Sequence, residues 1–460
     1  MKSLLILLLA LATSAYAEVA PELDASEEFP GGTGTTSDLS VQAYSHPMSG
    51  TQSRERREFT LGNSFFNTVW VASPSSTTVR DGLGPIYNAV SCSSCHFKDG
   101  RGRGLPETEG KVDVSLLFRL RIKTLNEGII PHPIYGGQFQ PQGIMGVPGE
   151  GEVVVRYETI RIQYPDGFFA ELLKPVYDFI KLNFGPLGEN TVRSPRVAPQ
   201  MSGLGLLETI SEQDILRKED PYDMDGDGIS GRANYVYSAT HQSQKLGRFG
   251  WKAGKATLND QNAAAFNGDI GITSSLHPDE DCTETQTDCL KNHTELDIDD
   301  ARLNNVTVYT QLLSVPVRRD FSKPEVQRGR STFYKINCIG CHTPSYTTGT
   351  NSNLEILKNQ KIYPYTDLLL HDMGDALADD KDEVTNEDLA TTREWRTPPL
   401  WGLGLTQTVN GHTRYLHDGR ARNLEEAILW HGGEAQKSKE AFLELTNSER
   451  SDLIMFLNSL

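Results

Sequence analysis

The sequence of 460 residues contains no long hydrophobic run and has few basic residues. Its most apolar stretch, residues 4–12, is shorter than the about 20 residues that a membrane-spanning helix needs, so we expect no membrane span. Lysine and arginine number 44 against 61 aspartates and glutamates, and the formal net charge is −17. A chain this acidic is not expected to bind nucleic acid. Its charge could attract a basic partner protein, although solubility alone also accounts for it.

The N-terminus has the three parts of a secretory signal. Lys2 supplies the positive charge, residues 4–12 the apolar core, and Ala15 and Ala17 the small residues before a cleavage point. No cysteine directly follows residue 17, so we expect no lipid anchor. The pattern therefore predicts a signal peptide over 1–17 and export to the periplasm.

Hydrophobic residues make up only 37% of the chain, whereas it contains 41 glycines and 23 prolines. This composition favours helices joined by long loops over a large sheet, so the predicted fold class is mainly α. Residues 18–45 combine Glu, Gly, Ser, Thr and Pro without periodicity, which predicts a flexible N-terminal arm.

Four of the six cysteines lie in two C-x-x-C-H patterns, Cys92-Ser93-Ser94-Cys95-His96 and Cys338-Ile339-Gly340-Cys341-His342. This is the attachment pattern of c-type haem, in which two thiols bind the porphyrin and the next histidine binds its iron. Zinc half-sites, thioredoxin-like redox pairs and disulfides are the alternatives. None of them requires a histidine directly after the second cysteine, twice. We therefore predict two covalently attached haems, with His96 and His342 as proximal ligands.

Each signature follows a segment with apolar residues at i and i+7 and a glycine at i+3, which places all three on one helix face. The two sets are Phe59, Gly62, Phe66 and Val326, Gly329, Phe333. The glycines would allow another helix or the porphyrin to approach closely. Ser322 is the expected N-cap of the second helix. The chain thus contains a divergent internal repeat of helix and haem signature.

Between the repeats, residues 149–164 alternate apolar and polar side chains, which predicts a short β-hairpin, while residues 168–182 resemble a helix. Cys282 and Cys289 are expected to form a disulfide, with metal binding as a minor alternative.

Residues 223–230 resemble the first half of a calcium loop. Carboxylates alternate there, and a backbone carbonyl follows them; the candidate ligands are Asp223, Asp225, Asp227 and Ile229. The twelfth position is Asn234 instead of the usual glutamate, so an Asp/Gly-rich surface turn is the alternative.

Residues 321–460 end in a predicted helix with a capping box formed by Thr446 and Glu449. A helix before C-x-x-C-H and an amphipathic helix at the terminus resemble the crossing helices of a cytochrome c. The expected organisation is an N-terminal haem domain over 46–320, including the central insertion with its hairpin, and a C-terminal cytochrome c domain over 321–460.

Longer motifs now point to one family. The order of the C-terminal signature and three later motifs resembles the bacterial di-haem cytochrome c peroxidase superfamily; these motifs are 395–400, 415–420 and 424–427. Further stretches are similar to its di-haem oxidoreductase branch, described as peroxidases or thiol oxidoreductases; they are 81–85, 247–253 and 369–374. The resemblance covers nearly all of residues 46–460. It implies that peroxide reacts at the N-terminal haem and that the C-terminal haem relays electrons.

The resemblance also suggests iron ligands. His431 falls where relatives place the distal ligand of the C-terminal haem, although better-known relatives use Met or Tyr. Met373 and His371 are the alternatives, and each could instead simply fill core space. His46 and His132 could close the N-terminal iron.

Three further residues are candidates for catalysis. His417 matches the histidine of the family's H-D-G motif, and Tyr135 aligns with its aromatic bridge between the haems. Glu150 and Glu152 lie at the distance expected for an acid/base group, with Glu152 as the candidate we select and a solvated turn as the alternative for both.

The expected function is that of an exported di-haem oxidoreductase of peroxidase type. A small cytochrome c or cupredoxin would supply its electrons. The alternatives are a purely electron-transferring cytochrome, or a haem-dependent oxygenase or protein side-chain oxidase with the same architecture.

Overall fold

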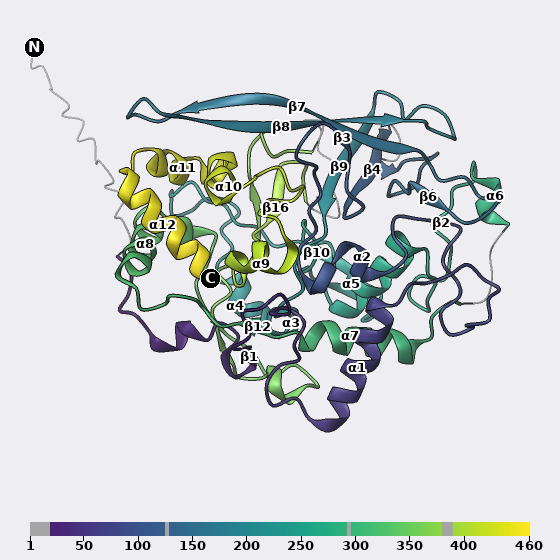
Figure 1. Cartoon of the computed structure of the whole chain (residues 1–460), viewed down its shortest axis with the longest axis horizontal. Coiled ribbons are helices and arrows are strands. Elements are labelled where there is room, and N and C mark those ends of the chain that lie inside the picture. The colour runs from purple at the N-terminus through teal and green to yellow at the C-terminus, as the bar shows by residue number, and fades with distance from the viewer. Residues whose placement is uncertain (1–18, 125–127, 292–295, 380–389) are drawn as a thin grey trace, which may run out of the picture.

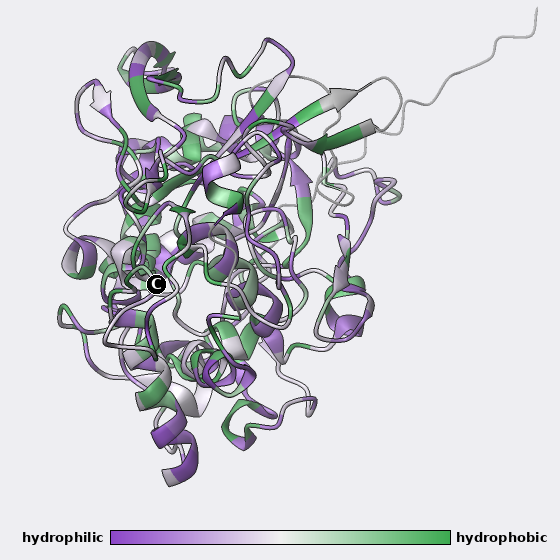
Figure 2. Cartoon of the chain, turned by 90° about the vertical axis from the view of Figure 1, so that its right-hand side faces the viewer, coloured by the Kyte–Doolittle hydropathy of each residue, from purple (hydrophilic) through white to green (hydrophobic). Residues whose placement is uncertain are grey.

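The computed structural model of the chain describes residues 19–124, 128–291, 296–379 and 390–460. The expected signal peptide, 1–17, lies outside the described residues. No helix among these described ranges is long and apolar enough to cross a membrane. Accordingly, the helices in Figure 2 carry hydrophilic and hydrophobic residues side by side.

The expectation of a mainly α fold is wrong, because the chain is 30% helical with 20% strand in many small sheets. The α-helices are α1 Ser53–Asn67, α2 Cys92–Cys95, α3 Leu204–Glu208, α4 Glu212–Leu216, α5 Leu258–Ala265, α6 Thr287–Leu290, α7 Asp300–Leu312, α8 Pro324–Lys335, α9 Thr406–Asn410, α10 Leu424–Trp430, α11 Gln436–Leu443 and α12 Asn447–Ser459. The longer strands are β4 Leu116–Thr124, β5 Gly128–Pro131, β7 Glu152–Gln163, β8 Phe169–Ile180, β9 Thr191–Val197, β10 Tyr235–Ser238 and β11 Ser243–Leu246.

The short strands occur in pairs or at sheet edges. They are β1 Thr35–Thr36, β2 Ile86–Tyr87, β3 Gly110–Lys111, β6 Gln142–Gly143, β12 Val315–Pro316, β13 Tyr346–Thr347, β14 Lys361–Ile362, β15 Leu370–Asp372 and β16 Glu394–Arg396. Two sheets have three strands, in the orders β3-β7-β8 and β5-β4-β9, and the five others have two strands each.

The predicted hairpin exists, but it is about twice as long as expected. Strand β7 pairs along its whole length with β8, from Glu152 opposite Ile180 to Gln163 opposite Phe169. The helix expected over 168–182 is therefore wrong. Pro175 lies in the middle of that segment, where it would break a helix, and β8 is an edge strand, where a proline is tolerated. The hairpin runs across the top of the molecule in Figure 1.

Two crossed helix pairs confirm the internal repeat, and they lie on opposite sides of the molecule in Figure 1. Helix α1 packs on α7 at Gly62, where a Cβ atom would lie 2.0 Å from the carbonyl oxygen of Asn305. Helix α8 packs on α12 at Gly329, where a Cβ atom would lie 1.9 Å from the carbonyl oxygen of Asp452. In both cases the glycine permits a close helix crossing. The capping box of α12 is also confirmed, whereas α8 is capped by Lys323 and not by Ser322.

Residues 19–45 are packed against the rest of the chain, which corrects the expected flexible arm. Glu27 is buried and forms ion pairs with Arg318 at 3.2 Å and with Arg330 at 2.7 Å. Strand β1 pairs with β12, and the Tyr44 hydroxyl donates to the carbonyl of Gly402. A buried carboxylate with two guanidinium partners fixes a segment that composition alone describes as polar and aperiodic.

The largest hydrophobic core joins residues from both expected domains. It contains Phe66 and Tyr309 of the N-terminal helix pair together with Leu357 and Trp401 from beyond residue 320. The boundary near residue 320 therefore stays a prediction. Cys92 packs against this core, whereas Cys338 packs against a second core that includes residues of α8 and α12.

Candidate functional site

One cavity is lined by both C-x-x-C-H signatures. It encloses about 3160 Å³ of non-protein space, part of it open to solvent. Cys92, Cys95, Cys338 and Cys341 line it as free thiols, and so do His96 and His342. Helix α2 carries the first signature, and the 3₁₀ turn Cys338–Gly340 carries the second. Two signatures 246 positions apart in sequence thus face the same interior space.

His96 and His342 are held in the same way. Nδ1 of His96 lies 2.7 Å from the carbonyl oxygen of Pro199, and Nδ1 of His342 lies 3.0 Å from that of Tyr365. A carbonyl only accepts, so each Nδ1 carries the proton and each Nε2 keeps a free lone pair. Burial lowers the pKa of both imidazoles to about 4, which keeps them neutral. A neutral imidazole oriented through its other nitrogen is the usual form of a metal ligand.

The surroundings of the two histidines repeat as well. Phe66 packs on His96 with ring centroids 6.1 Å apart, and Phe333 packs on His342 at 6.2 Å. Both phenylalanines are the i+7 residues of the helix patterns that precede the signatures. Each helix therefore supports the histidine that follows it.

His431, the expected second ligand of the C-terminal iron, lines the cavity directly after helix α10. Its Nδ1 donates to the carbonyl of Ala427 at 2.7 Å, so Nε2 is again the unprotonated nitrogen. Burial lowers its pKa. His431 and His342 thus both line the cavity with an unprotonated Nε2.

The alternative ligand His371 also lines the cavity, but its nitrogens are occupied. Nε2 lies 2.7 Å from Asp367 and Nδ1 lies 2.6 Å from Glu434. A ring held between two carboxylates donates from both nitrogens and has no lone pair for iron. Met373 remains in the lining as the other alternative.

Neither alternative ligand of the N-terminal iron lies in the cavity lining. Nε2 of His132 donates to the carbonyl of Leu187 at 2.9 Å, while its Nδ1 accepts from the amide of Ile134. His46 is half-exposed and pairs with Asp38 at 2.5 Å. Both histidines therefore serve local structure.

His417 lies in the cavity lining, where its ring stacks on Trp395 with centroids 3.7 Å apart and planes at 10°. Its Nε2 is buried without a protein partner. The ammonium of Lys252 lies 3.8 Å from the centroid of Trp395. Lys252 is itself fixed by an ion pair with Asp379 at 3.2 Å. Trp395 is thus held rigidly by two ring-face contacts at the edge of the cavity.

Tyr135, the expected aromatic bridge, is not in the cavity lining. It is buried among aromatic side chains and donates to the carbonyl of Gly185. Trp251 and Trp395 line the cavity instead. Both belong to motifs that carry the family resemblance, 247–253 and 395–400, and their presence in those motifs was the signal that could have identified them.

Neither expected acid/base glutamate lines the cavity. Glu152 lies on the hairpin surface and pairs with Lys181 at 3.1 Å. Glu150 is fully buried, and its carboxylate accepts from the amide of Gln140 and from the side chain of Gln286.

Asp269 is the carboxyl group that faces the N-terminal signature. It lies on a π-helical turn, Phe266–Ile270, which continues α5; such turns are frequent at functional sites. Its backbone carbonyl accepts from the amides of Asn88 and Ala89, just before Cys92. Burial raises the pKa of Asp269, an effect that Arg119 partly offsets. In sequence it is one aspartate among many, so only the fold reveals it.

The acidic loop differs from its expected ligand set. Asp220, Asp223 and Asp225 place one carboxylate oxygen each within 4.8 Å of one another. Asp227 instead accepts from the amide of Ile229 at 2.7 Å. Ile229 lines the cavity, and its side chain is in contact with Gly340 of the C-terminal signature.

A family model matches residues 25–460; its description is "Di-haem oxidoreductase, putative peroxidase". The chain belongs to the di-haem oxidoreductase family. The match extends the resemblance to almost the whole chain. Searches of curated proteins and of solved structures gave no match.

A di-haem oxidoreductase requires room and ligands for two haems, and this cavity fits both requirements. Each signature presents two free thiols and one neutral imidazole with an unprotonated Nε2. The lining is mostly apolar but includes Arg101, Arg196 and Arg396, which suit the propionates of a haem. The residues present therefore fit one haem at each signature.

Proposed function

We propose that this di-haem oxidoreductase reduces a peroxide at its N-terminal haem site with electrons that enter at its C-terminal haem site. The main support is that the two haem sites of this cavity differ in their candidate iron ligands. The C-terminal side offers a second neutral histidine, His431. On the N-terminal side, residues 258–270 contain no histidine or methionine, and Met201 is fixed beside the carbonyl of Pro199 that holds the proximal His96. That segment offers Asp269 instead.

Both haems are proposed to be of c-type, attached through Cys92 and Cys95 and through Cys338 and Cys341. Once bound, a haem supplies an iron that exchanges single electrons and, where a coordination position is open, takes up a small oxidant. His96 and His342 hold their lone pairs toward the cavity, and their backbone partners fix the ring orientation.

Reduction of hydrogen peroxide to two water molecules consumes two electrons and two protons. A small cytochrome c or cupredoxin is the proposed electron donor. Asp269 is proposed to hold and transfer the protons, because its raised pKa keeps the carboxyl protonated further toward neutral pH than an exposed aspartate. Trp395 and Trp251 add large apolar surfaces to the wall of the same cavity.

Export to the periplasm stays a proposal that rests on residues 1–17. Calcium binding is proposed for the acidic loop, with Asp220 in place of Asp227, because three carboxylate oxygens converge there. Calorimetric titration of the holoprotein with calcium tests this proposal. Heat that saturates in the wild type and disappears in Asp223→Asn supports it, and absence of binding in the wild type contradicts it.

Mixing of the half-reduced holoprotein with hydrogen peroxide tests the proposed function. We expect oxidation of the protein by peroxide, slowed about 10²-fold or more in Asp269→Asn, which is the usual contribution of a positioned acid/base group. Asp178→Asn is the matched control, because Asp178 pairs with Arg156 on the surface of the hairpin. A wild-type protein that does not react with peroxide would refute the proposal.

A further inference from the structure

Four carboxyl groups whose charges influence one another form what we call the carboxyl row: Asp269, Asp281, Glu150 and Glu280. Asp269 lines the cavity, Glu150 is fully buried, and Asp281 and Glu280 are partly exposed. The charges of these carboxyls affect one another's pKa values. Asp281 raises the pKa of Asp269, of Glu150 and of Glu280, in each case after the larger effect of burial. Asp281 is therefore the central member of the row.

Two buried glutamine side chains connect these carboxyls. The Gln138 amide donates to Asp269 at 2.9 Å and to Asn88 at 2.6 Å. The Gln140 side chain donates to Asp281 at 3.0 Å, while its backbone amide donates to Glu150. Both glutamines are almost completely buried, with 1% and 0% of their surface exposed. Asp269, in the cavity lining, and Asp281 are thus each held by one of two glutamines that flank Phe139 in the chain.

Three buried oxygens along this row have no hydrogen-bond partner among the residues that the structure describes. They are Oε1 of Gln138, Oε1 of Gln140 and Oε2 of Glu280. Buried polar oxygens are nearly always hydrogen-bonded, and internal water is the usual partner where protein supplies none. Three such oxygens among four carboxyls indicate positions where water molecules link one carboxyl to the next.

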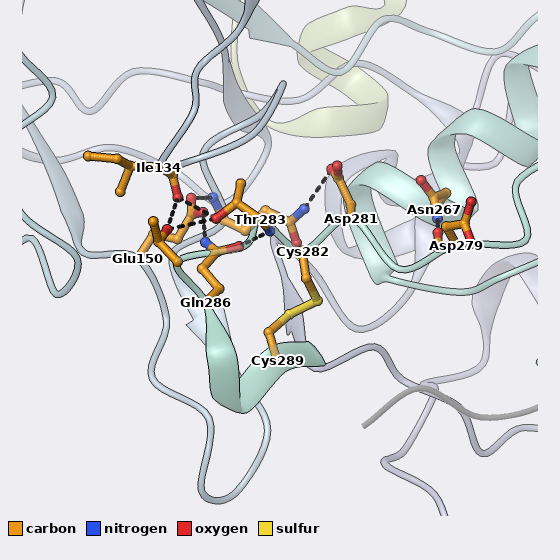
Figure 3. Close-up of a disulfide and its surroundings, with 11 residues drawn as sticks. Ile134, Glu150, Asn267, Asp279, Asp281, Cys282, Thr283, Gln286 and Cys289 are labelled. Carbon is orange, nitrogen blue, oxygen red and sulfur yellow. Dashed lines mark hydrogen bonds between the residues drawn. A yellow bond between two sulfur atoms is a disulfide. The ribbon is translucent and has the colours of Figure 1, made fainter. Parts of the chain in front are cut away.

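A disulfide closes the loop that directly follows Asp281 (Figure 3). Cys282, directly after Asp281, is bonded to Cys289, as the sequence predicts. Thr283 donates to the carbonyl of Ile134 at 2.8 Å, and Gln286 donates to Glu150. The loop is thereby held against the sheet that carries Arg119 and Gln138. Asp279, at the solvent side of this loop, is exposed.

The charge states suit groups that carry protons. Burial raises the pKa of Asp281, although Arg119 and the bond from Gln140 partly offset it. Burial, with Asp297 and Asp281, raises the pKa of Glu280 to about 8. Burial also raises the pKa of Glu150 well above its usual value. Structure alone does not require carboxyls whose pKa values are raised by burial, because amides or hydroxyls would satisfy the same hydrogen bonds at lower cost.

We propose that Glu280, Asp281 and Asp269, with the water between them, form a proton route from solvent to the N-terminal haem site. The inference rests on the proposed function, because peroxide reduction consumes two protons at that site. For each proton that Asp269 releases into the cavity, Asp281 passes one inward and Glu280 takes one up from solvent. No other bond forms or breaks along the route.

Asp281→Asn tests the route, because asparagine keeps the shape but cannot release a proton. We expect the rate of peroxide reduction to fall at least about tenfold, and to recover in Asp281→Glu. Asp288→Asn is the matched control: Asp288 lies in the same disulfide loop but pairs with Lys291 on the surface. Asp281→Asn that reacts as fast as Asp288→Asn would overturn the route.

A second readout does not depend on peroxide. Infrared difference spectra between the oxidised and reduced holoprotein report protonation changes of carboxyl groups. We expect a carboxylic-acid band in the wild type that is lost in Asp281→Asn and kept in Asp288→Asn; a band unaffected by Asp281→Asn contradicts the route. If the wild type does not react with peroxide, the proposed function fails while this measurement still decides on the route. If Asp281→Asn does not fold, Gln140→Met breaks the same link and is judged by the same two readouts.

Discussion

Lys252 is the residue whose replacement has the best-defined consequence. Its side chain is 3% exposed and its ammonium pairs with Asp379, which is equally buried. It also donates to the carbonyls of Thr391 and Glu394, at 2.9 and 2.8 Å, and lies over Trp395. Lys252→Met keeps the length of the aliphatic stem and removes the ammonium, with its charge and its hydrogen bonds to Thr391 and Glu394. It leaves Asp379 buried without its cation.

Loss of one partner from a buried ion pair costs about 3–5 kcal/mol, because the remaining charge stays desolvated. Loss of the contact between the ammonium and the ring of Trp395 costs up to about 2 kcal/mol of stability. The two costs are not additive, because both arise from removal of the same ammonium. Lys181→Met is the matched control. Lys181 pairs with Glu152 at a similar distance, 3.1 Å, but its side chain is 70% exposed. Loss of this ion pair therefore costs about 1 kcal/mol of stability at most.

Urea unfolding of the two holoproteins measures the difference. Visible absorbance follows the haem environment and circular dichroism follows the backbone, so the comparison does not require a single cooperative transition. We expect Lys252→Met to be less stable than Lys181→Met by about 3 kcal/mol or more. The double variant Lys252→Met/Asp379→Asn should regain part of the lost stability, because it no longer buries a charge without its partner. A difference below about 0.5 kcal/mol would refute the reasoning.

Three further predictions concern the helix crossing, the titration of Glu280 and the role of Glu152. Gly329→Ala should lower the free energy of unfolding by more than about 1 kcal/mol, because its Cβ would meet the backbone of α12. Gly137→Ala should leave it nearly unchanged, because a Cβ at that position has nothing within 4 Å. The pKa of Glu280 is raised from 4.5 to about 8, so its contribution to stability is full below pH 4.5 and is lost as pH rises through about 8. The melting temperature should therefore fall less between these pH values in Glu280→Gln than in the wild type. Glu152→Gln should reduce peroxide at a rate within about twofold of the wild type, and a loss comparable to that of Asp269→Asn would restore Glu152 as the acid/base group.

The local patterns of the haem signatures are what the sequence determines best. The i, i+3, i+7 spacing before each signature places a glycine at a helix crossing and a phenylalanine against the proximal histidine, and both are found twice. The disulfide and the capping box of α12 are equally local, and they are confirmed. Each of these features depends on residues within a few positions of one another.

Features that depend on distant partners could not be predicted in the same way. Residues 168–182 contain enough apolar residues for a helix, but β7 supplies a pairing partner along their whole length. Composition predicts that Glu27 is solvated in a polar segment, whereas Arg318 and Arg330 enclose it in the fold. Tertiary contacts override local preference in both cases.

The acid/base group shows the same limit. Counting residues after a motif selected Glu150 and Glu152, because relatives place a glutamate at that distance. The structure instead brings Asp269 to the cavity from a π-helical turn more than a hundred positions later. The position of a side chain in a cavity is a property of the assembled fold, and sequence distance does not report it.

Electron paramagnetic resonance of the holoprotein, oxidised and half-reduced, tests the central claim that the two haem sites are unequal. In the oxidised state we predict a low-spin signal from the site with His342 and His431. In the half-reduced state that site is ferrous and silent, and the remaining ferric site, with His96, gives a high-spin signal. His431→Gly should convert the low-spin signal of the oxidised protein to a high-spin one. Two low-spin signals in the oxidised state and one low-spin signal in the half-reduced state, unchanged by peroxide, would contradict the account.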